Sequence, residues 1–259
     1  MKKTLRSAML STICMLVVAV MSLTGVTYAW FSAAETATVG GMEVSVGAAG
    51  EGFMVSEDGT NWSSNVDFTG DVTKTELMPV STVDAKKFYS ATVKSTNGNA
   101  TTIVAEEDAG TAENGNVVSL TFFAKNTNTE DSVTIYLEQA NIFSASENSG
   151  NKEAYNAARM ALLIGEEVKY IWGAGDTNYG VQAGGEIADC NTLGGSIGTV
   201  TALKTNLQDC NFTIAADSQV TITLLLWIEG QDAQCINKNA ADTFNVNLGL
   251  TIHEPAAQG

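Results

Sequence analysis

Apolar and polar residues alternate with a period of two along several stretches of the chain, which is the pattern of β-strands with one buried face. Near the amino-terminal end, Met42, Val44 and Val46 alternate with polar or small residues. Residues 133–138 repeat the pattern, with Val, Ile and Leu at the odd positions. We therefore predict a strand at each place, with the apolar side chains turned inward.

The clearest alternation lies near the carboxyl-terminal end, in two runs. Residues 220–228 are apolar at every even position and also at Leu225 and Trp227, which predicts a central strand covered on both faces. Residues 244–252 alternate strictly between apolar and polar or small residues, which predicts a strand with one face in water. We expect these two late strands to pair with each other.

Turn signals separate the β-prone runs at Asp58-Gly59, Asn97-Gly98, Asn114-Gly115 and Gly165-Glu166-Glu167. Each is typical of a hairpin or loop. The window from Lys152 to about Met160 favours a helix, because it is rich in Ala. Many strands, frequent turns and little helix predict an all-β chain, a β-sandwich of jelly-roll type with one short surface helix.

The first 29 residues have the three-part layout of a secretory signal peptide. Basic residues within the first six positions precede an apolar run from Ala8 to about Leu23, and Thr27-Tyr28-Ala29 follows. We expect cleavage between Ala29 and Trp30, secretion, and one β-sandwich domain over residues 30–259. The alternative is a membrane-spanning helix kept in the mature protein, although this run is short for the roughly 20 apolar residues of a span.

Cleavage would make an acidic chain more acidic. The whole chain has 13 basic and 29 acidic residues, and the leader holds three of the basic ones and no acidic one, which leaves a net charge of −19. So acidic a surface repels nucleic acid and anionic lipid. We expect no nucleic-acid partner, and contact with a membrane only through the signal peptide before cleavage. A plain acidic coat and a coat that binds divalent cations both fit this charge.

The chain offers few groups for catalysis. Its single histidine, His253, excludes the two-histidine zinc motif and any cage of several histidines. A nucleophilic pair of His253 with a cysteine would lack an orienting group. Carboxylate pairs are open to the chain, but with 29 acidic residues such pairs arise by chance. We therefore expect no enzyme, no catalytic residue and no cofactor, with calcium binding as the alternative.

Three cysteines follow the leader: Cys190, Cys210 and Cys235. They allow one disulfide with a third thiol left over, or three reduced thiols in the core. A Cys190–Cys210 bridge is the weakly preferred pairing, because it would close the Gly-rich loop region that we place at residues 183–212.

Two features are candidates for binding. Trp62 follows the Asp58-Gly59 turn and could contact a glycan or a host surface from there, although packing in the core is the ordinary role of tryptophan. Glu229, Asp232 and Asn237 form an oxygen-rich stretch that could hold calcium. A solvated loop is the competing interpretation of that stretch.

Both ends of the chain resemble one known family, the TasA/camelysin proteins. The stretch Thr24–Gly47, TGVTYAWFSAAETATVGGMEVSVG, is similar to the family's junction of leader and first strand, with Gly25, Thr27, Tyr28, Ala29 and Phe31 in place and Val26 where a small residue is common. Glu229–Glu254 is similar to the closing strand of the family, with matches at Gly230, Asp232, Asp242, Thr243, Val246 and Leu248. Weaker similarities lie in Glu76–Thr82 and Leu120–Glu138, and residues 141–213 show none.

The family consists of exported proteins of Gram-positive bacteria with a dedicated (SipW-type) signal peptide. The resemblance implies a jelly-roll sandwich and a structural, non-enzymatic role at the cell surface or in a biofilm-like extracellular matrix, with partners that are further copies or other matrix proteins. Fibres of well-known members grow when an N-terminal strand passes to the next subunit. Trp30 and Phe31, at the start of residues 30–41, are therefore candidates for strand donation, and the alternative is that this segment forms the first strand of its own domain.

Two other functions fit parts of the sequence. A surface adhesin or glycan-binding module would use Trp62. Camelysins are described as cell-surface metalloproteases, but His253 alone does not supply a metal-binding set for that activity.

Overall fold

The computed structural model describes residues 37–47, 52–72, 75–80, 82, 84–96, 100–108, 116–145, 154–173, 210–230, 235 and 243–253. The chain divides into two units, residues 1–34 and 35–259, and every described residue belongs to the second. Within the described ranges no helix is long and apolar enough to cross a membrane. The predicted signal peptide, its cleavage at Ala29 and Trp30, and the Asn114-Gly115 turn lie outside these ranges.

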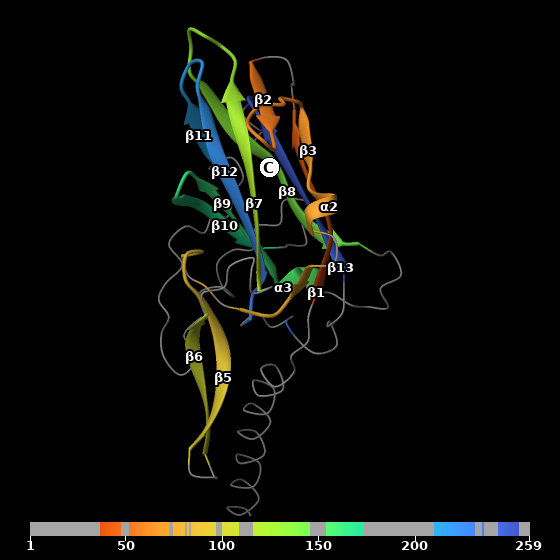
Figure 1. The fold of residues 1–259 in the computed structure, drawn as a ribbon, viewed down its shortest axis with the longest axis vertical. Helices are drawn as coiled ribbons and strands as arrows, with labels where there is room; N and C mark the ends of the chain where they lie inside the picture. Colours follow the sequence, from red (N-terminus) through yellow and green to blue (C-terminus); the bar gives the residue numbers. More distant parts are fainter. Residues whose placement is uncertain are drawn as a thin grey trace, which may run out of the picture. The chain divides into compact units, whose positions relative to one another are not determined.

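The described residues form strands and two one-turn helices (Figure 1). In chain order they are β1 (Ala37–Val46), β2 (Phe53–Ser56), β3 (Asn65–Asp67), α2 (Thr69–Val72), β4 (Thr75–Leu77), β5 (Phe88–Thr96), β6 (Ala100–Asp108), β7 (Val117–Asn126), β8 (Val133–Ser144), α3 (Ala154–Ala157), β9 (Ala158–Ile164), β10 (Glu167–Gly173), β11 (Asn211–Ile214), β12 (Gln219–Ile228) and β13 (Thr243–Thr251).

Two sheets contain most of these strands. Sheet A has the order β11-β8-β13-β1-β3, with β4 also paired with β1, and sheet B has the order β10-β9-β12-β7-β2. Strands β5 and β6 pair with each other as a separate hairpin. The ring of Phe68, next to β3, lies 6.3 Å from that of Phe122 in β7, so the inner faces of the two sheets meet there. This part of the chain is all-β and sandwich-like, as the sequence predicts.

The alternating pattern predicts the buried faces correctly in β1 and β8. Met42, Val44 and Val46 are buried, and the intervening Glu43 and Ser45 are exposed. In β8 the buried residues are Ile135 and Leu137, and then Ala140 and Ile142. The shift by one position follows from a bulge, because Gly249 pairs with Gln139 while Leu250 pairs with Leu137.

The predicted pairing of the two late strands is wrong. Strand β12 lies between β9 and β7 in sheet B, whereas β13 lies between β8 and β1 in sheet A. Both hydrogen-bonding edges of each strand are therefore occupied by other strands. The predicted central position of β12 is confirmed, and its second face is covered at Trp227, which is fully buried.

The predicted turn at Gly165-Glu166-Glu167 joins two neighbouring strands. Gly165 and Glu166 connect β9 to β10, where Ile164 pairs with Glu167. Gly165 has a φ of +62°, a conformation that glycine adopts without the clash of a side chain. The Asn97-Gly98 signal lies outside the described residues, between Thr96 of β5 and Ala100 of β6, which pair with each other.

The predicted helix from Lys152 to Met160 is too long. Helix α3 ends at Ala157, and the next three residues open β9. The reason is tertiary pairing: Met160 lies opposite Leu226 and Arg159 lies opposite Trp227 in β12. Strand β11 likewise begins at Asn211, so the last two residues of the predicted loop region belong to a strand.

Candidate functional site

Strand β1 lies inside sheet A, between β13 on one side and the short strands β3 and β4 on the other. It pairs in parallel with β13, from Thr38 opposite Thr243 to Val46 opposite Leu250. Its other edge is shared by two three-residue strands, β3 and β4. Residues 37–41, the described part of the candidate segment 30–41, therefore lie in β1, the first described strand. Trp30 and Phe31, the strand-donation candidates, lie outside the described residues.

The inner face of β1 contributes to the core along its whole length. Its buried residues are Ala37, Val39, Met42, Val44 and Val46. Loss of β1 from the sheet would expose the side chains that pack on these residues and would leave one edge of β13 without hydrogen-bond partners. Sheet A thus depends on an N-terminal strand inserted beside the C-terminal one.

The outer edges of sheet B, β10 and β2, are poorly suited to accepting an additional strand. On β10 the pairing with β9 shifts between Val168 and Tyr170, and Lys169 at the shift forms an ion pair with Glu167 at 2.6 Å. At the opposite edge of sheet B, Val55 of β2 already forms a bridge with Ser63. Bulges, charged residues and short edge strands are known to protect sheets from further pairing.

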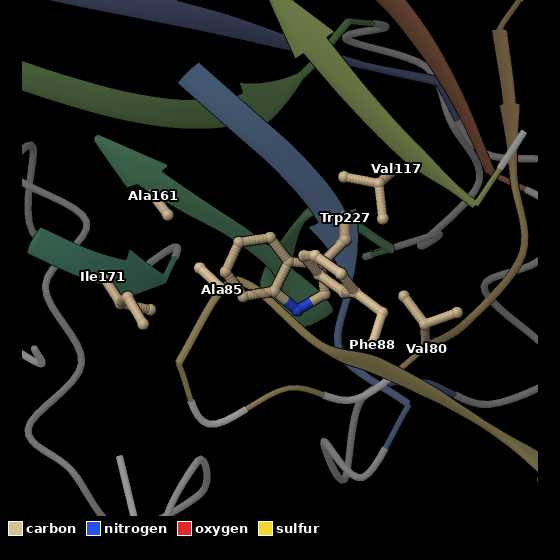
Figure 2. Close-up of a cluster of buried hydrophobic side chains, with 7 residues drawn as sticks. All are labelled: Val80, Ala85, Phe88, Val117, Ala161, Ile171 and Trp227. Carbon is tan, nitrogen blue, oxygen red and sulfur yellow. The ribbon is translucent and has the colours of Figure 1, made fainter. Parts of the chain in front are cut away.

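A compact group of buried residues covers the outer face of sheet B. Figure 2 shows the indole of Trp227 surrounded by Val80, Ala85, Phe88, Val117, Ala161 and Ile171. The Phe88 ring meets Trp227 edge-on, with centroids 5.5 Å apart. Val80 forms a parallel bridge with Glu229, the residue after β12. The described residues between Val80 and Phe88, which are 80, 82 and 84–88 and which we call the strap, therefore cover this face.

Two charged residues lie near this cluster, and both are fully buried. Nη1 of Arg159 donates hydrogen bonds to the carbonyl oxygens of Asn156 and Ala158, at 2.8 and 2.9 Å. Oε2 of Glu229 accepts a hydrogen bond from Nε1 of Trp227 at 3.2 Å. Sequence reasoning missed Arg159, because it placed this residue on a surface helix.

The structure describes only one of the three calcium candidates. Glu229 is buried against Trp227, whereas Asp232 and Asn237 lie outside the described ranges. Among the described residues no three His, Cys, Asp or Glu side chains group closely enough to hold a metal ion. The calcium stretch stays a prediction.

Trp62 is half-buried and lies beside a rigid loop. Oδ1 of Asp58 accepts hydrogen bonds from the backbone N–H groups of Thr60 and Asn61, at 2.8 and 2.7 Å. These bonds, and further ones from the Thr60 and Asn61 side chains, hold the pKa of Asp58 far below its ordinary value. The loop thus fixes the backbone that leads into Trp62.

The remaining residues that the sequence singles out are His253 and the three cysteines. His253 is exposed just after β13, and its backbone N–H donates to Oγ1 of Thr251. Cys210 and Cys235 are buried. Cys190 lies outside the described residues, so the proposed Cys190–Cys210 bridge stays a prediction.

These features define a class rather than a family: an all-β, sandwich-like protein whose first described strand pairs in parallel with its last. No model of a protein family matches the chain, and no curated protein sequence matches it.

Proposed function

We propose that the chain is an exported, non-enzymatic structural protein of jelly-roll type, which polymerises in an extracellular or cell-surface matrix by exchange of β1 between copies. One observation carries this proposal. Strand β1, the most N-terminal of the described strands, is inserted between β13 and two three-residue strands. A strand that lies inside the sheet and comes first among the described strands can be supplied by another copy without rearranging the other described strands.

Exchange costs little free energy, because the same contacts form within one copy or between two copies. The eight residue pairs with β13 keep their backbone hydrogen bonds in either arrangement. The alternating apolar residues of β1 enter the same core sites, as in strand addition to an open sheet. When each copy gives its strand to the next, the contact is head-to-tail and an open filament results.

The protected outer edges support exchange over simple edge-to-edge addition. The bulge at Lys169 and the bridge at Ser63 occupy or distort the edges of sheet B. An incoming strand therefore finds a better place where β1 already lies than at either edge of sheet B. The resemblance of Thr24–Gly47 to exported matrix proteins supports secretion, and it adds Trp30 and Phe31 to the donated segment.

A reversible covalent lock tests the exchange. Ser45 of β1 and Asn65 of β3 are exposed and lie opposite each other in an antiparallel pair, at a separation that suits a disulfide. The double variant Ser45→Cys/Asn65→Cys is expressed as the full chain and recovered from the culture medium. Its mature N-terminus reports the cleavage position. The single variants are the matched controls.

When the monomer is oxidised before assembly, β1 is tied to its own domain, and we expect monomers without fibres by size-exclusion chromatography and electron microscopy. Reduction should restore fibres. Oxidation after assembly should join neighbouring copies, which gives a covalent ladder on a non-reducing gel. Fibres from the locked monomer would refute exchange of β1, and wild-type chains that never assemble would refute the fibre itself. Casein hydrolysis that EDTA abolishes would instead support the metalloprotease alternative.

A further inference from the structure

The outer face of sheet A has an unusual composition, which the proposed assembly does not use. Four amide side chains on β8 and β13 lie there, all half-buried: Gln139, Asn141, Asn245 and Asn247. Asn247 lies opposite Asn141, and Asn245 lies opposite Phe143. Phe143 is 38% exposed, although it is a large apolar residue. We call this set the amide face.

The bulge in β8 places two aromatic residues on this one face. Tyr136 pairs with Thr251 and Phe143 pairs with Asn245, and both partners alternate with the core residues Val246, Leu248 and Leu250 of β13, although Thr251 is itself buried. At the usual rise of a strand, the two rings lie roughly 20 Å apart along β8. The amides of Gln139 and Asn141 lie between them. Gly249 of β13 packs closely against Gln139, because a Cβ on Gly249 would approach the Gln139 side chain to 3.0 Å.

This arrangement suits a ligand with apolar ring faces and many hydroxyl groups. An amide side chain both donates and accepts hydrogen bonds, so it can pair with either role of a hydroxyl group. An exposed aromatic ring offers a flat apolar surface to the C–H face of a sugar ring. A row of neutral amides with an aromatic residue at each end matches an extended chain of sugar units.

The charges on this face exclude other classes of ligand. Glu43 and Asp67 occupy opposite positions on β1 and β3, and Glu138 is exposed on β8. No Lys or Arg lies on this face within the described ranges. Anionic polymers and anionic membranes would therefore be repelled. A protein partner is a poor match as well, since the face lacks the apolar centre of a protein interface.

We propose that the amide face binds a neutral, hydroxyl-rich polysaccharide, laid along β8 and β13 between Tyr136 and Phe143. The binding needs no second copy of the chain and does not involve Trp62. It therefore goes beyond the proposed assembly, and it can fail or succeed independently of that assembly.

The test uses the full chain, with the monomeric fraction taken for each measurement. Binding is measured against insoluble cellulose and chitin and a soluble neutral β-glucan, with alginate as the anionic polymer and chitosan as the cationic one. Two variants remove side chains of the amide face: Phe143→Ala removes the aromatic ring, and Asn245→Ala/Asn247→Ala removes two amides. The matched control is Thr121→Ala/Thr223→Ala, a polar cross-strand pair in sheet B whose hydroxyl oxygens lie 3.3 Å apart. Trp62→Ala is the second control.

We expect wild type to bind at least one neutral polymer, with affinity about tenfold lower in each amide-face variant, because two hydrogen-bonding groups or one stacking surface are lost. Both controls should stay within about twofold. Equal binding by all variants, loss only in Trp62→Ala, binding only to chitosan, or no binding to any neutral polymer would each overturn the proposal. Thermal unfolding checks the fold of each variant, and Phe143→Ala alters an exposed side chain, so at least one variant stays informative.

Discussion

Nε1 of Trp227 donates a hydrogen bond to Oε2 of Glu229 across 3.2 Å, and both side chains are fully buried. The two residues are two positions apart, at the end of β12, so their side chains share one face. The backbone of Glu229 also bridges Val80 in the strap. A carboxylate that the sequence suggests for calcium thus accepts a hydrogen bond inside the core.

Glu229→Ala should destabilise the protein by about 1–3 kcal/mol, because the buried indole N–H of Trp227 loses its acceptor. Glu229→Gln should cost less, since the amide oxygen still accepts. Urea unfolding followed by circular dichroism measures both, with the exposed Glu166→Ala as the control. An unchanged unfolding midpoint for Glu229→Ala would contradict this role. A calcium-dependent rise in the melting temperature that Glu229→Gln abolishes would favour the calcium site instead.

The sequence predicts which faces are buried better than which strands are neighbours. Period-two alternation places Met42 and Val44 inward correctly, because a strand turns successive side chains to opposite faces. The same pattern contains no information about pairing partners, so the prediction that β12 and β13 pair with each other is wrong. The sequence fails to predict the buried position of Arg159 for a related reason. Its Ala-rich surroundings favour a helix, and only the pairing with Trp227 makes this segment a strand.

Phe88→Ala should loosen the strap. The Phe88 ring is 4% exposed and meets Trp227 edge-on, so its removal leaves a cavity beside the indole. We expect a loss of about 3 kcal/mol in the free energy of unfolding. Lys86→Ala, two residues earlier and exposed, is the matched control. Proteolysis in the strap should accelerate in Phe88→Ala, and an unchanged cleavage rate and unfolding midpoint would show that the strap does not depend on this contact.

Gly173→Ala tests the packing of the buried guanidinium. A Cβ on Gly173 would lie 2.8 Å from Nη1 and 2.9 Å from Cδ of Arg159, which is itself fully buried. Because the Arg159 side chain has little room to move, we expect a loss of about 1–3 kcal/mol from overpacking.

Gly70→Ala is the control for Gly173→Ala, since a Cβ there meets no atom within 4 Å. Its stability should be unchanged or slightly higher, because Ala favours the helical conformation of α2. Thermal unfolding measures the melting temperatures of both variants for this comparison. Equal melting temperatures for the two would show that Arg159 can move away without cost.

The Asp58 loop should make stability depend on pH at the acid end. Backbone and side-chain hydrogen bonds from Asn61 and Thr60 depress the pKa of Asp58 in the folded state. A group whose pKa is lower in the folded state contributes stability above its unfolded pKa of about 4. That contribution is lost as the pH falls from there toward the folded pKa. Asp58→Ala should therefore melt below wild type at pH 7, and the gap should narrow below about pH 4.

Asp58→Asn separates charge from geometry in this loop. Its side-chain oxygen still accepts from the N–H groups of Thr60 and Asn61, so the turn is kept while the titrating group is removed. Its melting temperature at pH 7 should lie between those of wild type and Asp58→Ala. Glu57→Gln removes one charge from the neighbouring exposed position and is the control for net charge. If Glu57→Gln and Asp58→Asn shift the acid end of the melting profile equally, general charge repulsion accounts for the pH dependence, and the hydrogen bonds of Asp58 do not.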